Sequence, residues 1–361
     1  MYLTFYQLKE EPFRLTPDPR FLHLAIPHRA VLSSLVEGVL HHRGVITVSG
    51  PIGTGKTTLL HTTLHMLRNP RVSKTPIASA FLLNPTMTKE ELLEAVLDEF
   101  EIPCSSTSKP RRLAALNQML LETQQRGGTA VLIVDEAHLL SAELLEEIRL
   151  LSNTDSYREK LLQIILSGQP EMQSLLARPE MRALQQRIAT RCHLRELTQP
   201  ETRAYVAERL HAAGLRGASP FSGEALEEIQ RYTNGVPRLI NLLCDACLTL
   251  GHAGQLTQIP PGIVEEAAKT LELSDSLAEQ LPVASSKDVL VGNATPNSSI
   301  DVFVEAMKQF RAGATADSSA NAKSEPAVST NEDARSEIRV LRSVVDVLID
   351  AMKQNLAAAR E

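Results

Sequence analysis

The stretch that most restricts the fold of this chain is GPIGTGKT, residues 50–57. It matches the pattern G-x-x-x-x-G-K-[ST] at every fixed position, follows the apolar run GVITVS (44–49), and leads into a helical pattern. A glycine-rich loop in this setting surrounds phosphate groups with backbone N–H groups, and the helix N-terminus adds the positive end of its dipole. The stretch therefore predicts a phosphate-binding loop.

Two side chains of this loop are expected to do specific chemistry. Lys56 would place a cation beside the β- and γ-phosphate oxygens, and the Thr57 hydroxyl would be a ligand of Mg²⁺. The loop thus predicts ATP and Mg²⁺ as cofactors. The expected nucleotide-binding residues are Gly50, Pro51, Ile52, Gly53, Thr54, Gly55, Lys56, Thr57 and Thr58.

A second feature is a pair of carboxylates that ends an uninterrupted apolar run, AVLIVD (130–135). Asp135 would hold Mg²⁺, directly or through a bound water, and Glu136 would polarise the attacking water. His138 completes the letters DEAH in the turn that follows. The sequence leaves open whether His138 is a surface or capping residue or takes a direct part.

Strand and helix patterns alternate as far as Leu197, which predicts a parallel, three-layered α/β sheet. The pattern then changes to four helical segments that form a small all-helical domain. Its cysteines Cys244 and Cys247 fall in an apolar helical pattern, so we expect buried free thiols rather than a zinc site. The expected strands are 44–49, 77–84, 130–135, 161–168 and 190–197, and the later helices are 198–214, 222–235, 237–251 and 260–273.

The C-terminal part has a linker-like composition rich in Ser, Ala, Asn and Thr. Within it, DVFVEAMKQFRAGA (301–314) and DVLIDAMKQNLAAA (346–359) are identical at more than half of their positions. The expected organisation is therefore an α/β domain over 1–197 with an N-terminal linker over 1–42, a helical lid over 198–273, a flexible linker over 274–335 with a short helix at 300–312, and an amphipathic helix over 336–361.

The net charge of the chain gives no general signal for binding to nucleic acid. The formal net charge is −6, so the balance of charge does not by itself indicate nucleic-acid binding. KPRR (109–112) and the arginine-rich stretch 178–195 nevertheless leave room for a local basic groove. The mixed N-terminal sequence does not resemble a signal peptide, and no apolar stretch is long enough to span a membrane, so we expect a cytoplasmic protein.

These motifs together resemble the AAA+ ATPases of the general secretion pathway A type, a group close to bacterial transposition ATPases and more distantly to origin-recognition ATPases. The resemblance covers about residues 1–272. It rests on FYQLKEEPFRLTPDPRFLHL, GPIGTGKTTLL, DEAHLLSAELLEEIRLLSN, LLQIILSGQPEM, MRALQQRI and TNGVPRLINLLCDACL, in that order.

The resemblance implies further site residues. Gln169 matches a polar sensor of the γ-phosphate, and Arg238 matches the second sensor at the start of a lid helix. Arg187 matches an arginine finger that acts on the ATP of a neighbouring subunit, with Arg182 and Arg191 as competitors. A homo-oligomeric ring or filament is therefore expected. The segment TPDPRF (16–21) is similar to the part that packs near the adenine.

Two functions remain open at this point. One is an ATP-driven motor that assembles or remodels a secretion or envelope complex, and the other is an ATP-switched, DNA-associated adaptor that recruits a transposase or recombinase. The tail is short and polar where the secretion members have a membrane span and a periplasmic region, and its repeats at 301–314 and 346–359 are candidate partner-binding helices. A DEAH helicase would need a second RecA-like domain, whereas only helical segments follow Leu197.

Overall fold

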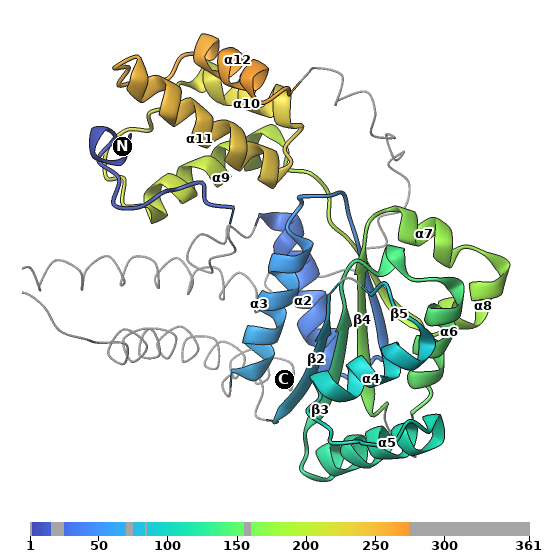
Figure 1. Cartoon of the computed structure of the whole chain (residues 1–361). Helices are drawn as coiled ribbons and strands as arrows, with labels where there is room; N and C mark the ends of the chain where they lie inside the picture. Colours follow the sequence, from blue (N-terminus) through green and yellow to red (C-terminus); the bar gives the residue numbers. More distant parts are fainter. Residues whose placement is uncertain (1, 16–24, 70–74, 84, 155–159, 274–361) are drawn as a thin grey trace, which may run out of the picture. The chain divides into compact units, whose positions relative to one another are not determined.

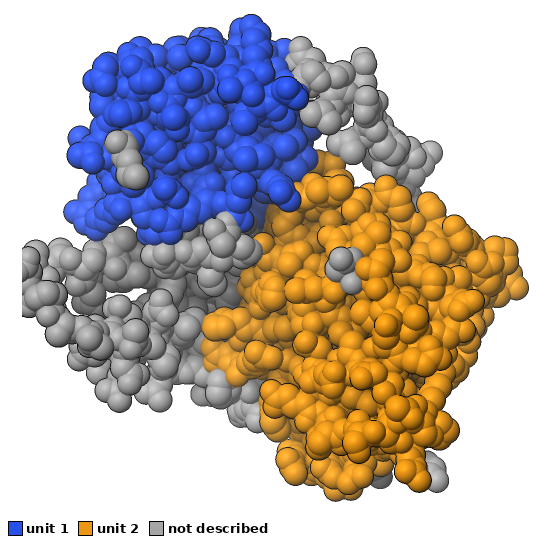
Figure 2. Space-filling model, viewed as in Figure 1, with its two compact units in different colours: residues 1–25, 197–361 blue, residues 26–196 orange. Residues whose placement is uncertain are grey.

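The computed structural model describes residues 2–15, 25–69, 75–83, 85–154 and 160–273. It divides into two compact units (Figure 2). The α/β unit is Ile26–Glu196, and the helical unit combines Met1–Ala25 with the chain from Leu197 onward. The linker expected at 274–335, the tail repeats and the C-terminal helix lie outside the described residues.

The α/β unit is built on five parallel strands in the order β2-β3-β4-β1-β5. Strands β1, β3 and β4 are buried along their whole length because both faces of the sheet are covered. The fifth strand begins and ends earlier than the expected range 190–197. The strands are β1 Val45–Ser49, β2 Ile77–Leu82, β3 Thr129–Val134, β4 Leu162–Gly168 and β5 Ile188–His193.

Helices cover both faces of this sheet, so the predicted three-layered α/β fold is confirmed (Figure 1). Helices α2 (Ile26–Leu40) and α3 (Lys56–Arg68) lie on one face. The other face carries α4 (Lys89–Glu99), α5 (Lys109–Gln125) and α6 (Ala142–Leu151). Between β4 and β5 the chain forms α7 (Glu171–Leu176), a 3₁₀ turn at Pro179–Met181 and α8 (Arg182–Gln185).

The helical unit contains the four helices that were predicted after Leu197. They surround their own apolar core, to which the buried thiols of Cys244 and Cys247 belong. Burial raises the pKa of the Cys247 thiol to about 12 and that of the Cys244 thiol well above its ordinary value. The helices are α9 Gln199–Ala212, α10 Gly223–Thr233, α11 Pro237–Ala253 and α12 Pro261–Thr270.

The N-terminal residues differ from the expected linker over 1–42. Residues 1–25 belong to the helical unit, where α1 (Tyr2–Phe5) contacts α11 and Phe13 is buried in the core. Arg209 of α9 donates hydrogen bonds to the carbonyls of Pro12 (2.6 Å) and Arg14 (3.0 Å). Residues 26–40 form α2 because their apolar side chains recur at helical spacing and Pro27 falls in the first turn, where proline is tolerated.

Candidate nucleotide-binding site

The phosphate-binding loop joins the end of β1 to the start of α3, as the sequence predicted. Gly53 and Gly55 have φ angles of 80° and 95°, in the left-handed region that glycine adopts without a steric penalty. This lets the chain turn twice within a few residues and enter α3 at Lys56. Ile52 is exposed, whereas Thr54 is fully buried and its hydroxyl donates to the Pro51 carbonyl (2.8 Å).

Lys56 is buried within the loop. Its ammonium group donates hydrogen bonds to the carbonyls of Gly50 (2.7 Å) and Pro51 (2.9 Å). Burial lowers the pKa of Lys56, and the negative charges of Glu136, Asp135 and Glu171 oppose that shift. The loop thus holds a poorly hydrated cation close to three carboxylates.

The Thr57 hydroxyl contacts the acidic pair. It donates a hydrogen bond of 2.6 Å to the Oδ2 atom of Asp135, which follows β3 and is 1% exposed. Asp135 Oδ1 accepts a hydrogen bond from the backbone N–H of Glu136 (3.0 Å). The Thr57 hydroxyl and the Asp135 carboxylate, which converge from the loop after β1 and from the end of β3, are hard oxygen donors of the kind that Mg²⁺ prefers, so these two residues fit that ion. Thr58, one residue further along α3, is half-buried.

Glu136 has an unusual backbone conformation. Its φ and ψ angles are 52° and 35°, in the left-handed region, and its carbonyl accepts a hydrogen bond from the backbone N–H of Leu139 (2.9 Å). A non-glycine residue in this region costs roughly 1–2 kcal/mol. Its Oε2 atom is buried without a hydrogen-bond partner among the described residues. The nearby ring nitrogen Nδ1 of His138 is 3.3 Å from that atom.

Gln169 follows β4, at the same edge of the sheet as the loop and the acidic pair. The register places the ends of β1 and β4 together, because Ser49 pairs with Gly168. The backbone N–H of Gln169 donates to His138 Nδ1 (3.4 Å). One edge of the sheet therefore brings together the loop, Asp135, Glu136, His138 and Gln169, as expected when parallel strands end side by side.

Within the α/β unit, the arginine implied as a finger, Arg187, lies away from this group. Arg187 immediately precedes β5, whose first residue, Ile188, pairs with Val45 at the start of β1. Arg187 therefore lies at the edge of the sheet opposite the loop, about 15 Å away along strands of this length. There it is half-buried and donates to the Ser152 carbonyl (3.3 Å). The lid arginine Arg238 is exposed at the start of α11, in the helical unit.

Sequence reasoning missed two supports of the loop. His28, a buried residue of α2, has its Nε2 atom 2.8 Å from the Thr54 carbonyl. Gln173 of α7 donates to the Ser49 hydroxyl at the end of β1 (2.7 Å). The helical spacing of apolar residues in 26–40 could have indicated α2, but nothing in the sequence marks His28 or Gln173 as neighbours of the loop.

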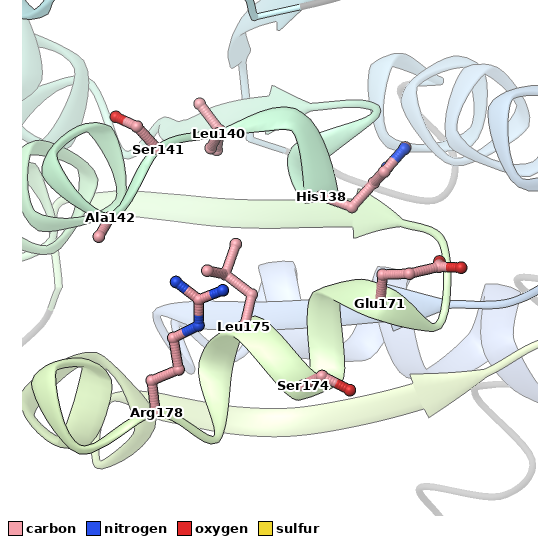
Figure 3. Close-up of a pocket in the computed structure, with 8 residues that line it drawn as sticks. All are labelled: His138, Leu140, Ser141, Ala142, Glu171, Ser174, Leu175 and Arg178. Atoms are coloured by element: carbon pink, nitrogen blue, oxygen red, sulfur yellow. The ribbon is translucent and has the colours of Figure 1, made fainter.

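A pocket of about 410 Å³ lies between the segment that follows β3 and helix α7. Figure 3 shows His138 and Glu171 at one end of it and Arg178 at the other. Leu140 and Leu175 supply apolar wall between them. His138 therefore borders both this pocket and the carboxylate of Glu136.

A five-stranded parallel sheet with a phosphate-binding loop after β1, an acidic pair after β3 and a separate helical unit defines an AAA+ nucleotide-binding protein. A family model described as AAA domain matches residues 39–176. Residues 39–176 thus contain an AAA domain, and the chain resembles AAA+ ATPases of the general secretion pathway A type. Within the described residues, no helix has the length and apolarity needed to cross a bilayer.

One curated sequence relative is general secretion pathway protein A of Aeromonas hydrophila. It is 38% identical over 270 residues, which are 74% of this chain and 48% of that protein. The chain therefore spans about half the length of this curated relative.

Solved structures share the fold. The Drosophila ORC bound to DNA matches with a TM-score of 0.57 at 16% identity, covering 94% of this chain and 83% of that chain. Cdc6p from Pyrobaculum aerophilum matches with a TM-score of 0.55 at 16% identity, covering 83% and 78% of the two chains.

Proposed function

We propose that this protein hydrolyses ATP with Mg²⁺. The observation that carries the proposal is the hydrogen bond of 2.6 Å between Thr57 and Asp135, since it places both expected metal ligands beside the phosphate-binding loop. The bound metal would neutralise charge on the β- and γ-phosphates. Thr57 and Asp135 would hold that ion, and Lys56 would exchange its bonds to the loop carbonyls for bonds to phosphate oxygens.

Glu136 and Gln169 would act at the γ-phosphate end of the same site. Glu136 would orient the attacking water and accept its proton, and Gln169 would report the presence of the terminal phosphate. Arg187 is too far along the sheet to reach its own loop, which supports a role on the ATP of a neighbouring subunit. Arg238 would complete the site from the lid. Hydrolysis would then depend on assembly into a ring or filament.

Phosphate release and nucleotide binding, measured side by side, test this proposal. The wild-type chain should release phosphate from ATP only when Mg²⁺ is present. Glu136→Gln should bind ATP as the wild type does and hydrolyse it at least 100-fold more slowly, as is usual when a group acting in the transition state is removed. Equal hydrolysis by the two proteins would disprove the role of Glu136, and absence of ATP binding by the wild type would disprove the proposal as a whole.

We further propose that ATP hydrolysis drives the assembly or remodelling of a partner complex, related to secretion or the cell envelope. The support is the similarity to general secretion pathway protein A. The repeats at 301–314 and 346–359 would dock that partner. Removing residues 275–361 should leave ATP binding intact and abolish stimulation of hydrolysis by the partner complex. Loss of ATP binding on this deletion would instead assign the tail a structural role.

The alternative is an ATP-switched adaptor on DNA, and one solved relative of this fold is described as bound to DNA. Two of the three cations of KPRR are neutralised by nearby carboxylates, which weakens the case for that stretch as the contact. Lys109 pairs with Glu147 (2.7 Å), and Arg112 is buried and pairs with Glu94 (2.9 Å). The exposed Arg111, Arg182 and Arg191 remain as candidate phosphate contacts. ATP-dependent DNA binding that weakens steeply with salt would favour the adaptor, and no binding at low salt would exclude it.

A further inference from the structure

His138 lies between Gln169, the proposed sensor of the γ-phosphate, and Glu136, which is proposed to orient the attacking water. Its Nδ1 atom is 3.3 Å from Glu136 Oε2 and 3.4 Å from the backbone nitrogen of Gln169. The side chain is 12% exposed. The 3₁₀ turn Ala137–Leu139 fixes the backbone on which it stands, and Gly168 lies against that turn, where an added Cβ would be 3.0 Å from the backbone nitrogen of His138.

Nδ1 cannot form hydrogen bonds with Glu136 and Gln169 at the same time, because it is either a donor or an acceptor. If Nδ1 carries the proton, it donates to the Glu136 carboxylate and offers no lone pair to the N–H of Gln169. If Nδ1 is unprotonated, it accepts from Gln169 and leaves Glu136 Oε2 without a donor. That oxygen is buried and makes no hydrogen bond among the described residues, so a proton on Nδ1, which lies 3.3 Å away, would supply the donor that holds the carboxylate.

We propose that His138 is a positioning residue that orients the Glu136 carboxylate through Nδ1 and ties this orientation to the main chain of Gln169. The inference rests on the proposed ATP hydrolysis. When the segment after β4 shifts toward a bound terminal phosphate, the N–H of Gln169 leaves Nδ1. The tautomer with its proton on Nδ1 then donates to Glu136 and fixes the carboxylate toward the attacking water. His138 itself touches neither nucleotide nor metal.

Three substitutions distinguish a role of His138 in orienting Glu136 from a role in packing alone. The side-chain amide of His138→Asn can reach the place of Nδ1, whereas that of His138→Gln reaches the place of Nε2, and His138→Ala reaches neither. We expect kcat to fall about 10- to 100-fold in the Ala and Gln variants, the usual loss when a side chain that orients a reacting group is removed. The Asn variant should recover most of the rate. The Kd for ATP should stay within about twofold of the wild type in all three, because only an interaction made in the transition state is lost.

A histidine away from the site serves as the control, and the tautomer of the His138 ring can be measured directly. His211→Ala removes an exposed histidine of α9 and should leave kcat unchanged. In the Glu136→Gln background, His138→Ala should cause no additional loss. The ¹⁵N resonances of the His138 ring, assigned by their absence in His138→Asn, should shift toward the protonated-Nδ1 tautomer when the wild-type chain binds Mg²⁺ and a non-hydrolysable ATP analogue.

The outcomes are distinct. A wild-type kcat in His138→Ala, equal losses in all three variants, or ring resonances that do not move with nucleotide would each overturn the role of His138. Unimpaired hydrolysis by Glu136→Gln would instead refute the proposed role of Glu136.

Discussion

The hydroxyl of Thr57 donates to Asp135 Oδ2 over 2.6 Å, although 78 positions separate the two residues in the chain. The parallel sheet makes this contact, because β1 and β3 both run to the edge at which α3 begins. A first prediction concerns this pair. Thr57→Val should remove most of the gain in ATP affinity that Mg²⁺ provides and leave metal-free nucleotide binding within about threefold, because the hydroxyl is a ligand and not a loop support.

Titration calorimetry with and without Mg²⁺ measures that difference. Thr62→Val is the matched control, since Thr62 lies on the same helix and its hydroxyl donates only to the Thr58 carbonyl (2.8 Å). A Thr57→Val chain with a full Mg²⁺ effect would show that this hydroxyl does not hold the metal.

Lys56 provides a second prediction. Lys56→Ala should weaken ATP binding about 10- to 100-fold, as expected when a charge-assisted hydrogen bond worth roughly 1.5–3 kcal/mol is lost. A fluorescent ATP analogue reports the Kd. Lys89→Ala, which removes an exposed cation paired with Glu143 (3.1 Å), should bind normally. Equal affinities for Lys56→Ala and the wild type would place the phosphates elsewhere.

Arg187 can be tested by mixing inactive subunits. Arg187→Ala and Glu136→Gln should each be at least 100-fold slower than the wild type, because a finger can supply about 10³–10⁵ in rate. Mixed together they should regain a measurable fraction of the wild-type rate, since a subunit with intact Glu136 can then receive Arg187 from its neighbour. Arg182→Ala and Arg191→Ala, tested in the same way, identify which arginine acts. No recovery for any of the three would contradict a finger supplied by a neighbour.

The architecture was predictable from the sequence to a large extent. Uninterrupted apolar runs marked the central strands, and the change of pattern after Leu197 marked the helical unit. The placement of the segment before α2 was not predictable in this way, because it depends on tertiary contacts with helices that come much later in the chain. Its binding to the helical unit depends on Arg209, which reaches the Pro12 carbonyl across 197 positions of sequence.

Site residues were predictable only where they belong to a short sequence motif. The loop and Asp135 belong to short patterns with a fixed strand context. His28 and Gln173 act through tertiary contacts, His28 at the Thr54 carbonyl and Gln173 at the Ser49 hydroxyl, for which no sequence spacing exists. The geometry of His138 likewise emerges only when β3 and β4 are placed side by side.

Arg209 also gives a prediction of stability. It is buried and donates to the carbonyls of Pro12 and Arg14 and to the Tyr205 hydroxyl (2.9 Å). Arg209→Leu should lower the free energy of unfolding of the helical unit by about 2–4 kcal/mol, because these acceptors lose their donor. The control Arg203→Ala removes an exposed pair with Glu227 and should lower it by less than about 1 kcal/mol.

Tyrosine fluorescence follows this unfolding selectively. Tryptophan is absent, and four of the five tyrosines, Tyr2, Tyr6, Tyr205 and Tyr232, belong to the helical unit. Urea midpoints that are equal for the two variants would show that Arg209 does not fasten the N-terminal segment.

The thiols give a prediction about pH. Burial raises the pKa of Cys192 to about 11 and that of Cys247 to about 12, and it raises that of Cys244 well above its ordinary value. At pH 8 these three thiols should stay protonated and react slowly with a disulfide reagent, whereas the partly exposed Cys104 reacts first. In urea all four should react. Because a raised pKa favours the proton-bound folded state, stability should fall as the pH rises above about 9, the ordinary value, toward these raised values.

The left-handed backbone of Glu136 has a consequence for how this protein could change under selection. Glycine is the one residue that adopts φ 52° without a steric penalty, so Glu136→Gly should relieve roughly 1 kcal/mol of strain while it removes the carboxylate. A screen for thermal stability alone would therefore enrich an inactive chain at this position. Glutamate is retained at position 136 only as long as selection acts on ATP hydrolysis. Selection for thermal stability and selection for activity therefore favour different residues at this position.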